Sequence, residues 1–127
     1  MSTKEAVMTT QDVANRFNEL AQSGQWDKVQ EELYADDAES IEPASAAAMG
    51  ISNAKGLDAI KKKGEAFNAT VEEMHGGYSS EPHVAGNHFS VAMGMDATMK
   101  GAGRVKMDEI AVYEVKDGKI VKEQFFF

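Results

Sequence analysis

The stretch Phe89-Ser90-Val91-Ala92-Met93-Gly94-Met95-Asp96-Ala97-Thr98-Met99 decides the fold, because its apolar residues alternate with small or polar ones. A period of two predicts a β-strand with one apolar face. Turn residues flank it, with Ala85-Gly86-Asn87 before and Lys100-Gly101-Ala102-Gly103 after. The second half of the chain is therefore expected to be an antiparallel meander of four strands: 71–84, the quoted stretch, 104–115 and 119–127.

The first half of the chain is expected to be helical. Apolar residues recur there every three or four positions in three segments, which is the period of an amphipathic helix. The first helix is capped by Thr9 or Thr10 and ends at Gly24. The second starts near Gln25 and the third near Leu57.

A short strand over 39–43, stopped by Pro43, and a loop over 44–54 separate the second and third helices. Helices followed by a strand meander predict an α+β fold, in which a curved antiparallel sheet wraps around three N-terminal helices. No linker-like segment divides the chain. Residues 1–127 should therefore form a single domain, with 1–8 frayed.

Composition excludes several classes of protein and site. The 127 residues include 13 Lys+Arg, 21 Asp+Glu and no Cys, with a formal net charge of −8. Nucleic-acid binding needs a basic face, so that partner is not expected. The absence of Cys excludes disulfides and thiolate metal sites, and it fits a reducing, cytoplasmic compartment. We expect no membrane partner, because no apolar run approaches about 20 residues.

Two groups of basic residues are interpreted as surface features. Lys61-Lys62-Lys63 should be a solvated helix face, too short for a binding patch. The histidines His75, His83 and His88 lack the spacing of a metal site and should lie on strand surfaces. No metal and no cofactor is therefore expected.

The hairpin around Asp117-Gly118 decides which side chains of the last strand face inward. A two-residue turn would pair Val115 with Ile120. A three-residue loop, with Gly118 as a bulge, would pair Val115 with Lys119 instead. The residue pattern alone leaves both registers open.

Two motifs carry a resemblance to known families. Leu33-Tyr34-Ala35-Asp36-Asp37-Ala38, followed three residues later by Glu42-Pro43, closely resembles the ketosteroid isomerases. The ending, from Tyr113-Glu114-Val115 through Lys119-Ile120-Val121 to Phe125-Phe126-Phe127, is typical of SnoaL-like proteins. Both groups belong to the nuclear-transport-factor-2-like superfamily with its cystatin-like fold. The resemblance spans roughly 10–127 and implies a cone-shaped barrel and a homodimer.

The resemblance carries the isomerase chemistry over only in part. The general base of that family falls on Glu42, and Tyr34 keeps its hydroxyl. The tyrosine of the oxyanion hole falls on Phe17, its aspartic acid near Ala111 and another pocket tyrosine near Gly64. Each lost oxyanion donor costs roughly 3 kcal/mol of transition-state stabilisation. The chain is therefore not expected to be a working ketosteroid isomerase.

The same match places Met107 on the pocket side, which favours the three-residue hairpin loop. Glu123 then faces inward across from Ala111, while Glu109 is expected to pair with Arg104 or a lysine at the rim. The expected catalytic residues are Glu42 as base, with Tyr34 or Glu123 as donor. The expected ligand-binding residues are Phe17, Trp26, Gly64, Met93, Met95, Met107, Ala111, Tyr113, Phe125 and Phe127.

These features predict a mostly apolar pocket for a small apolar or amphipathic molecule. Proton transfer of the isomerase or cyclase type, next to a carbonyl, would be its chemistry. The alternatives are a binding module of the same fold without chemistry, favoured by the missing donors, and a protein-interaction module. An outer sheet face bearing Ile110, Val112, Ile120 and Phe126 predicts a homodimer, because a sheet that is apolar on both faces needs cover on both.

Overall fold

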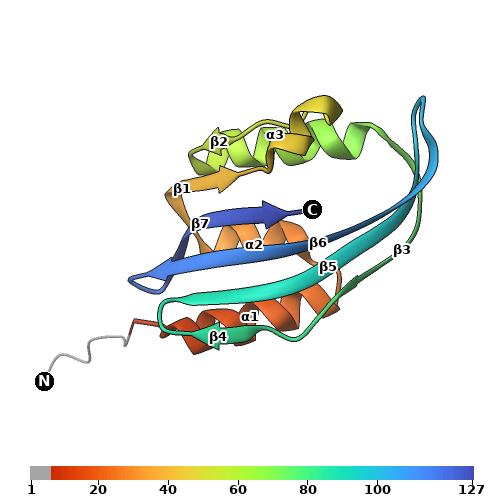
Figure 1. The fold of residues 1–127 in the computed structure, drawn as a ribbon. Helices are drawn as coiled ribbons and strands as arrows, with labels where there is room; N and C mark the ends of the chain where they lie inside the picture. Colours follow the sequence, from red (N-terminus) through yellow and green to blue (C-terminus); the bar gives the residue numbers. More distant parts are fainter. Residues whose placement is uncertain (1–6) are drawn as a thin grey trace, which may run out of the picture.

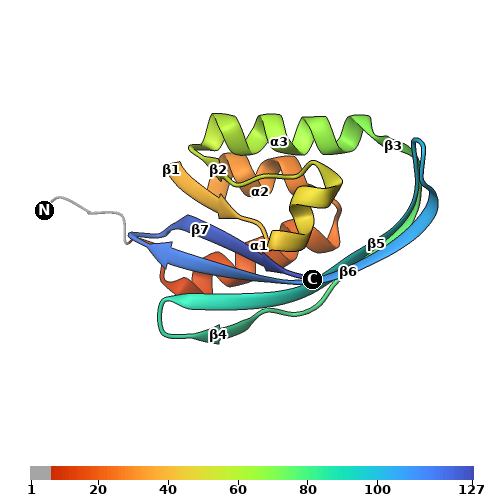
Figure 2. The same ribbon diagram turned by 45° about the horizontal axis from the view of Figure 1, so that its top comes forward.

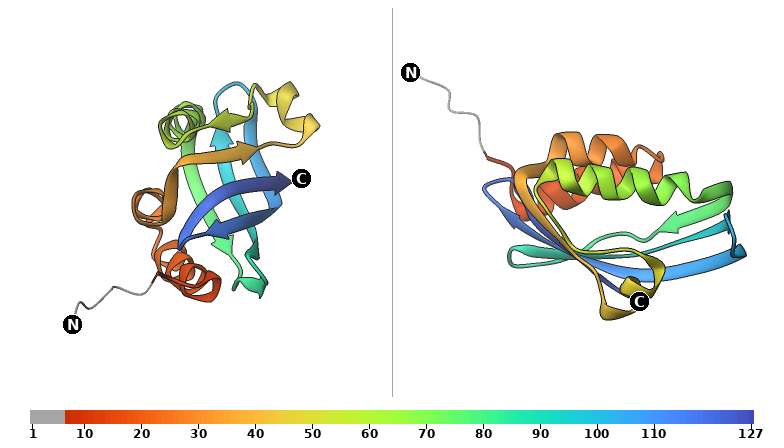
Figure 3. Two further views of the ribbon diagram at one scale, coloured as in Figure 1. Left: turned by 90° about the vertical axis from the view of Figure 1, so that its left-hand side faces the viewer. Right: turned by 90° about the horizontal axis from the view of Figure 1, so that it is seen from above.

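The computed structural model describes residues 7–127, so most of the stretch expected to fray, 1–8, lies outside the described part. Three helices, α1 (Thr10–Gln22), α2 (Trp26–Leu33) and α3 (Leu57–Ala69), lie along one face of a curved sheet (Figures 1 and 3). The predicted α+β class and the curved sheet are confirmed. None of these helices is long and apolar enough to cross a membrane.

The sheet has the strand order β2-β1-β7-β6-β5-β3, with β4 paired to β5 outside this path. The strands are β1 (Tyr34–Ile41), β2 (Ala54–Lys55), β3 (Val71–Ser79), β4 (His83–Ala85), β5 (His88–Met99), β6 (Gly103–Lys116) and β7 (Lys119–Phe126). All pairs are antiparallel except β1 and β7, which are parallel. The sheet curves without closing, and Figure 2 shows β5 and β6 bending toward the end of α3.

The helix predicted after Thr9 forms because its first turn is capped from both sides. The Thr9 hydroxyl accepts a hydrogen bond from the Asp12 N–H at 3.1 Å, and the Asp12 carboxylate accepts one from the Thr9 N–H at 3.0 Å. The buried face of α1 then meets the sheet through Phe17. Its ring centroid lies 4.8 Å from that of Tyr113 and 5.4 Å from that of Phe89.

Three predicted boundaries differ from the structure. The strand expected over 39–43 begins at Tyr34, which pairs with Ile120 of β7, and the register shifts before Glu39 pairs with Lys122. The loop expected over 44–54 contains the 3₁₀ helix η1 (Ala44–Met49) and ends at the first residue of β2. The strand expected over 71–84 is interrupted before Pro82, which lacks the N–H that a continuous ladder needs.

The last hairpin has a two-residue turn, so the three-residue loop was wrong. Asp117 and Gly118 both have positive φ, at 51° and 76°, as a type I′ turn requires. Val115 accordingly pairs with Ile120. Ile120 was expected on the outer sheet face. It is instead fully buried in the core.

A β-bulge then changes the register of the same hairpin. Glu114 pairs with Lys122, which leaves Val121 as an additional residue on β7. Beyond the bulge Glu123 pairs with Tyr113 and therefore faces inward, as expected, although not across from Ala111. The inward orientation expected for Glu123 is thus correct. The expected three-residue loop and the expected pairing of Glu123 with Ala111 were wrong.

Candidate functional site

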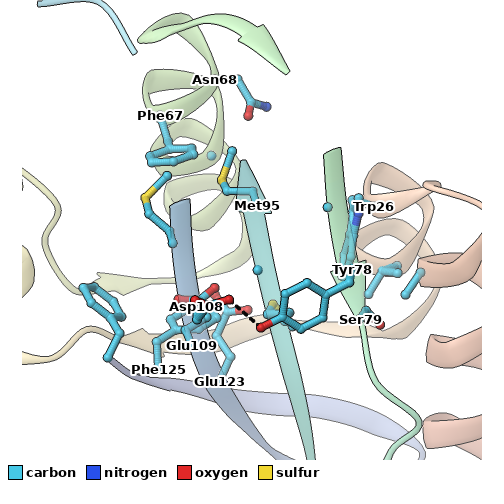
Figure 4. Close-up of a pocket in the computed structure, with 18 of the residues that line it drawn as sticks. Trp26, Phe67, Asn68, Tyr78, Ser79, Met95, Asp108, Glu109, Glu123 and Phe125 are labelled. Carbon is cyan, nitrogen blue, oxygen red and sulfur yellow. Dashed lines mark hydrogen bonds between the residues drawn. The ribbon is translucent and has the colours of Figure 1, made fainter. Parts of the chain in front are cut away.

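A cavity of about 1010 Å³ lies between the helices and the concave face of the sheet (Figure 4). Its volume is at the upper end of the range for small-molecule sites. The predicted residues in its wall are Phe17, Trp26, Tyr34, Glu42, Gly64, Met93, Met95, Met107, Tyr113, Glu123, Phe125 and Phe127. Ala111 is not among them, because its small side chain is fully buried in the core behind the wall.

Lys63 enters this cavity, which corrects its interpretation as part of a solvated helix face. Its Nζ donates hydrogen bonds to Glu42 Oε2 at 2.8 Å and to Ser40 Oγ, and it lies 5.8 Å from the centroid of the Phe125 ring. The side chains of Lys63 and Glu42 are only 18% and 9% exposed. Lys63 follows the buried Ile60 by three positions, so helical spacing alone could have placed it on the inner face.

Tyr34 and Glu123 form a buried pair at the base of the cavity. The Tyr34 hydroxyl donates a hydrogen bond to Glu123 Oε1, and Ser40 pairs with Glu123 across β1 and β7. Burial raises the pKa of Glu123 above its ordinary value. Burial, followed by the neighbouring Glu123 charge, also raises the pKa of Tyr34. Burial therefore disfavours the ionised form of both groups.

Glu109 lies in the cavity wall, and in the described part of the chain the partner expected for it, Arg104 or a lysine at the rim, does not pair with it. Within the described residues 7–127, its carboxyl has no hydrogen-bond or ion-pair partner, and Arg104 pairs with Asp96 at 2.9 Å instead. Burial is the largest cause that raises the pKa of Glu109 to about 7, followed by the charges of Glu42 and Glu123. This carboxyl can therefore gain or lose a proton near neutral pH.

A second feature of the wall is the close approach of Tyr78 to Gly94. A Cβ on Gly94 would lie 2.5 Å from Tyr78 Cε1 and 2.7 Å from the Met107 carbonyl oxygen, so only glycine fits there. The Tyr78 hydroxyl donates a hydrogen bond to Asp108 at 2.6 Å (Figure 4). This contact ties β3 to β6 across β5.

The cavity wall carries ionisable side chains from several elements. No group of His, Asp or Glu side chains that could hold a metal ion is found over residues 7–127. The three histidines are exposed. His75 is in the cavity wall, where its Nε2 lies 2.7 Å from Thr98 Oγ1. The wall also carries four carboxyls, from Glu42, Asp108, Glu109 and Glu123, two ammoniums, from Lys63 and Lys106, and the buried tyrosines Tyr34 and Tyr113.

Comparisons with known proteins agree with this architecture. The family model of the SnoaL-like domain matches residues 8–127. A structure from Mesorhizobium loti, named as a SnoaL-like polyketide cyclase and carbohydrate phosphatase, is 34% identical, with a TM-score of 0.83 over 94% of this chain and 100% of that one. No curated protein matches the chain.

Two further structures show similarity in fold alone. A nuclear-transport-factor-2-like protein of Burkholderia pseudomallei is 16% identical, with a TM-score of 0.74 over 93% of this chain and 89% of that one. A protein with a cystatin-like fold from Xanthomonas campestris is also 16% identical, with a TM-score of 0.75 over 94% of this chain and 90% of that one.

Proposed function

The chain belongs to the SnoaL-like domain family, and on that premise we propose that it binds a small, largely apolar molecule in the cavity and transfers a proton on it. The observation that carries the proposal is the unpartnered carboxyl of Glu109 in the cavity wall, with its pKa raised to about 7. A general base works best when its pKa lies near the working pH. The name of the Mesorhizobium loti protein, a polyketide cyclase, is consistent with carbonyl chemistry.

In this proposal Glu109 takes a proton from a carbon next to a carbonyl group. The electron pair left on carbon moves to the carbonyl oxygen, and the proton later returns from Glu109 to the product. An ammonium has three N–H donors, and Lys63 directs two of them at Ser40 and Glu42. The third has no hydrogen-bond partner among residues 7–127 and can donate to the ligand oxygen, so Lys63 supplies a donor that Phe17 and Ala111 cannot.

The other expected catalytic residues take supporting roles in this proposal. Glu42 was expected to be the base, but its carboxylate accepts a hydrogen bond from Lys63 and holds that ammonium in place. The Tyr34 proton is directed at Glu123. Burial, followed by the charges of Glu42 and Glu123, keeps the pKa of Glu109 high.

Exchange of carbon-bound hydrogen with deuterated water tests the proposal directly. The probe is 2-tetralone, an apolar ketone with exchangeable hydrogens next to its carbonyl, and the readout is NMR. The protein should accelerate exchange over buffer, and Glu109→Gln should lose about 100-fold of that acceleration. The rate should rise with pH through about 7, where Glu109 ionises. Glu65→Gln, an exposed change on α3, is the control.

A non-catalytic binding module is the second candidate function. Phe17, which has no hydrogen-bond donor, stands in the cavity wall against Trp26 and Tyr113, where the isomerases carry a donor. Binding of 2-tetralone without faster exchange, equal in the protein and in Glu109→Gln, would favour this candidate. Trp26, the single tryptophan, reports the binding by its fluorescence. We place either activity in the cytoplasm, since a chain without Cys suits a reducing compartment.

A further inference from the structure

One row of side chains crosses the cavity face of the sheet from β3 to β6. Ser79 of β3 pairs with Met93 of β5, and Met93 pairs with Glu109 of β6. Directly paired residues point to the same face of a sheet, and all three residues are in the cavity wall. Neighbouring strands are about 4.8 Å apart, so the Ser79 and Glu109 positions are about 10 Å apart.

The first end of the row is an unsatisfied hydroxyl. Ser79 Oγ is buried and has no hydrogen-bond partner among the described residues. A buried hydroxyl without a partner is unfavourable, and a hydrogen-bonding group on a bound molecule would relieve that cost. The Ser79 carbonyl accepts a hydrogen bond from Gln22 Nε2 at 2.8 Å, which anchors this end of β3 to α1. Rotation about χ1 can turn Oγ toward the cavity while this backbone stays in place.

The second end of the row is the carboxyl of Glu109, which also lacks a partner within residues 7–127. The two ends lie in different surroundings: Ser79 lies near Tyr78 and Trp26, and Glu109 lies near Glu123 and Phe125 (Figure 4). Met93 lies between them and presents an unbranched apolar side chain that adapts to a flat surface. The cavity face therefore has a polar group at each end of an apolar floor.

We propose that this row binds an elongated, largely apolar molecule with a hydroxyl or carbonyl group at each end, about 10 Å apart. One end exchanges hydrogen bonds with Ser79 Oγ and the other with Glu109, while the apolar middle lies over Met93. The proposal rests on the proposed function of the same cavity. It adds the ligand's shape and makes Ser79 a specificity-determining residue, remote from the carboxyl that moves the proton.

Two matched probes test the row by isothermal titration calorimetry. Biphenyl-4,4′-diol has a hydroxyl at each end of a rigid apolar body, and biphenyl-4-ol lacks one of them. The protein should bind the diol about 5-fold more tightly, as one additional neutral hydrogen bond predicts. Ser79→Ala should reduce that ratio to about 1 and leave the affinity for biphenyl-4-ol unchanged, whereas Ser79→Thr should keep the preference because it keeps the hydroxyl.

Ser90→Ala is the matched control, since Ser90 lies on β5 with its side chain on the opposite face to Met93. It should leave the diol preference intact. Equal binding of both probes to the unmodified protein, or an undiminished ratio in Ser79→Ala, would overturn the two-ended site while leaving apolar binding in place. Failure of the unmodified protein to bind either probe would contradict the proposed function itself, and with it this proposal.

Discussion

At the scale of single residues, the acids of the cavity wall differ in whether they have a partner, and among the described residues Glu109 has none. Glu42 is paired with Lys63, and Glu123 accepts a hydrogen bond from Tyr34. Glu109 is left with desolvation and two neighbouring charges, which together raise its pKa to about 7. A group whose pKa is higher in the folded than in the unfolded protein binds more protons when folded. It therefore stabilises the fold at low pH.

Glu109 should make the folded protein less stable as the pH rises from about 4.5 to above 7. Below the unfolded pKa its contribution is fully present, and it is lost as the pH rises through the folded pKa of about 7. Partial exposure reduces the loss to about 1–2 kcal/mol. Glu109→Gln should remove this part of the pH dependence in urea unfolding at pH 5 and pH 8. Parallel profiles for the two proteins would contradict the assignment.

Removal of Lys63 should leave the carboxylate of Glu42 without a partner in a poorly solvated position. Lys63→Met should therefore lower the free energy of unfolding by about 2–3 kcal/mol. This is at or just below the range for removing one partner of a fully buried ion pair, because both side chains keep some exposure. Lys62→Met, at an exposed neighbouring position on α3, should change it little. Adding Glu42→Gln to Lys63→Met should recover part of the loss in urea unfolding. An unchanged stability in Lys63→Met would show that the pair is solvated.

At the scale of elements, the hairpin of β6 and β7 determines which side chains reach the cavity. Its turn and its bulge act in succession. The turn buries Ile120, and the additional residue Val121 then returns Glu123 to the inner face. A hairpin without the bulge would place Glu123 on the opposite face, away from Tyr34. The candidate site therefore depends on a backbone irregularity in a strand that otherwise looks regular.

Gly118→Ala should destabilise the protein more than Gly101→Ala. Both glycines have positive φ, at 76° and 77°, which costs an L-residue about 1–2 kcal/mol. An added Cβ at Gly118 would also lie 2.9 Å from Val7 Cγ1, whereas nothing lies within 4 Å at Gly101. Thermal unfolding of the two variants measures the difference. Equal melting temperatures would show that only the backbone conformation matters at Gly118.

At the scale of the whole molecule, the outer sheet face is the surface without cover in the described structure. Ile110 and Phe126 pair directly across β6 and β7, and they are 51% and 49% exposed. The helices cover only the opposite face (Figure 3). Apolar side chains paired on a solvent-facing sheet are typical of a surface that another chain covers. We propose that a second copy of this chain packs against this face.

Light scattering during size-exclusion chromatography measures this self-association. The unmodified protein should elute as a dimer at micromolar concentration, and Ile110→Lys should shift it to the monomer. Met49→Lys changes a residue of similar exposure on η1, outside the sheet, and should leave the dimer intact. A monomer at micromolar concentration for the unmodified protein would defeat the proposal.

Local patterns in the sequence were sufficient to predict the three helices and the strand meander. The family resemblance supplied several of the predicted site residues, and all of those except Ala111 lie in the cavity wall. Helical and strand periods are properties of neighbouring residues, and they report directly which side faces inward. The tertiary structure alone decided the pairing of Lys63 with Glu42, the parallel contact of β1 with β7, the bulge at Val121 and the isolation of Glu109. Each of these depends on residues far apart in the chain, whose separation, solvation and charge no local period encodes.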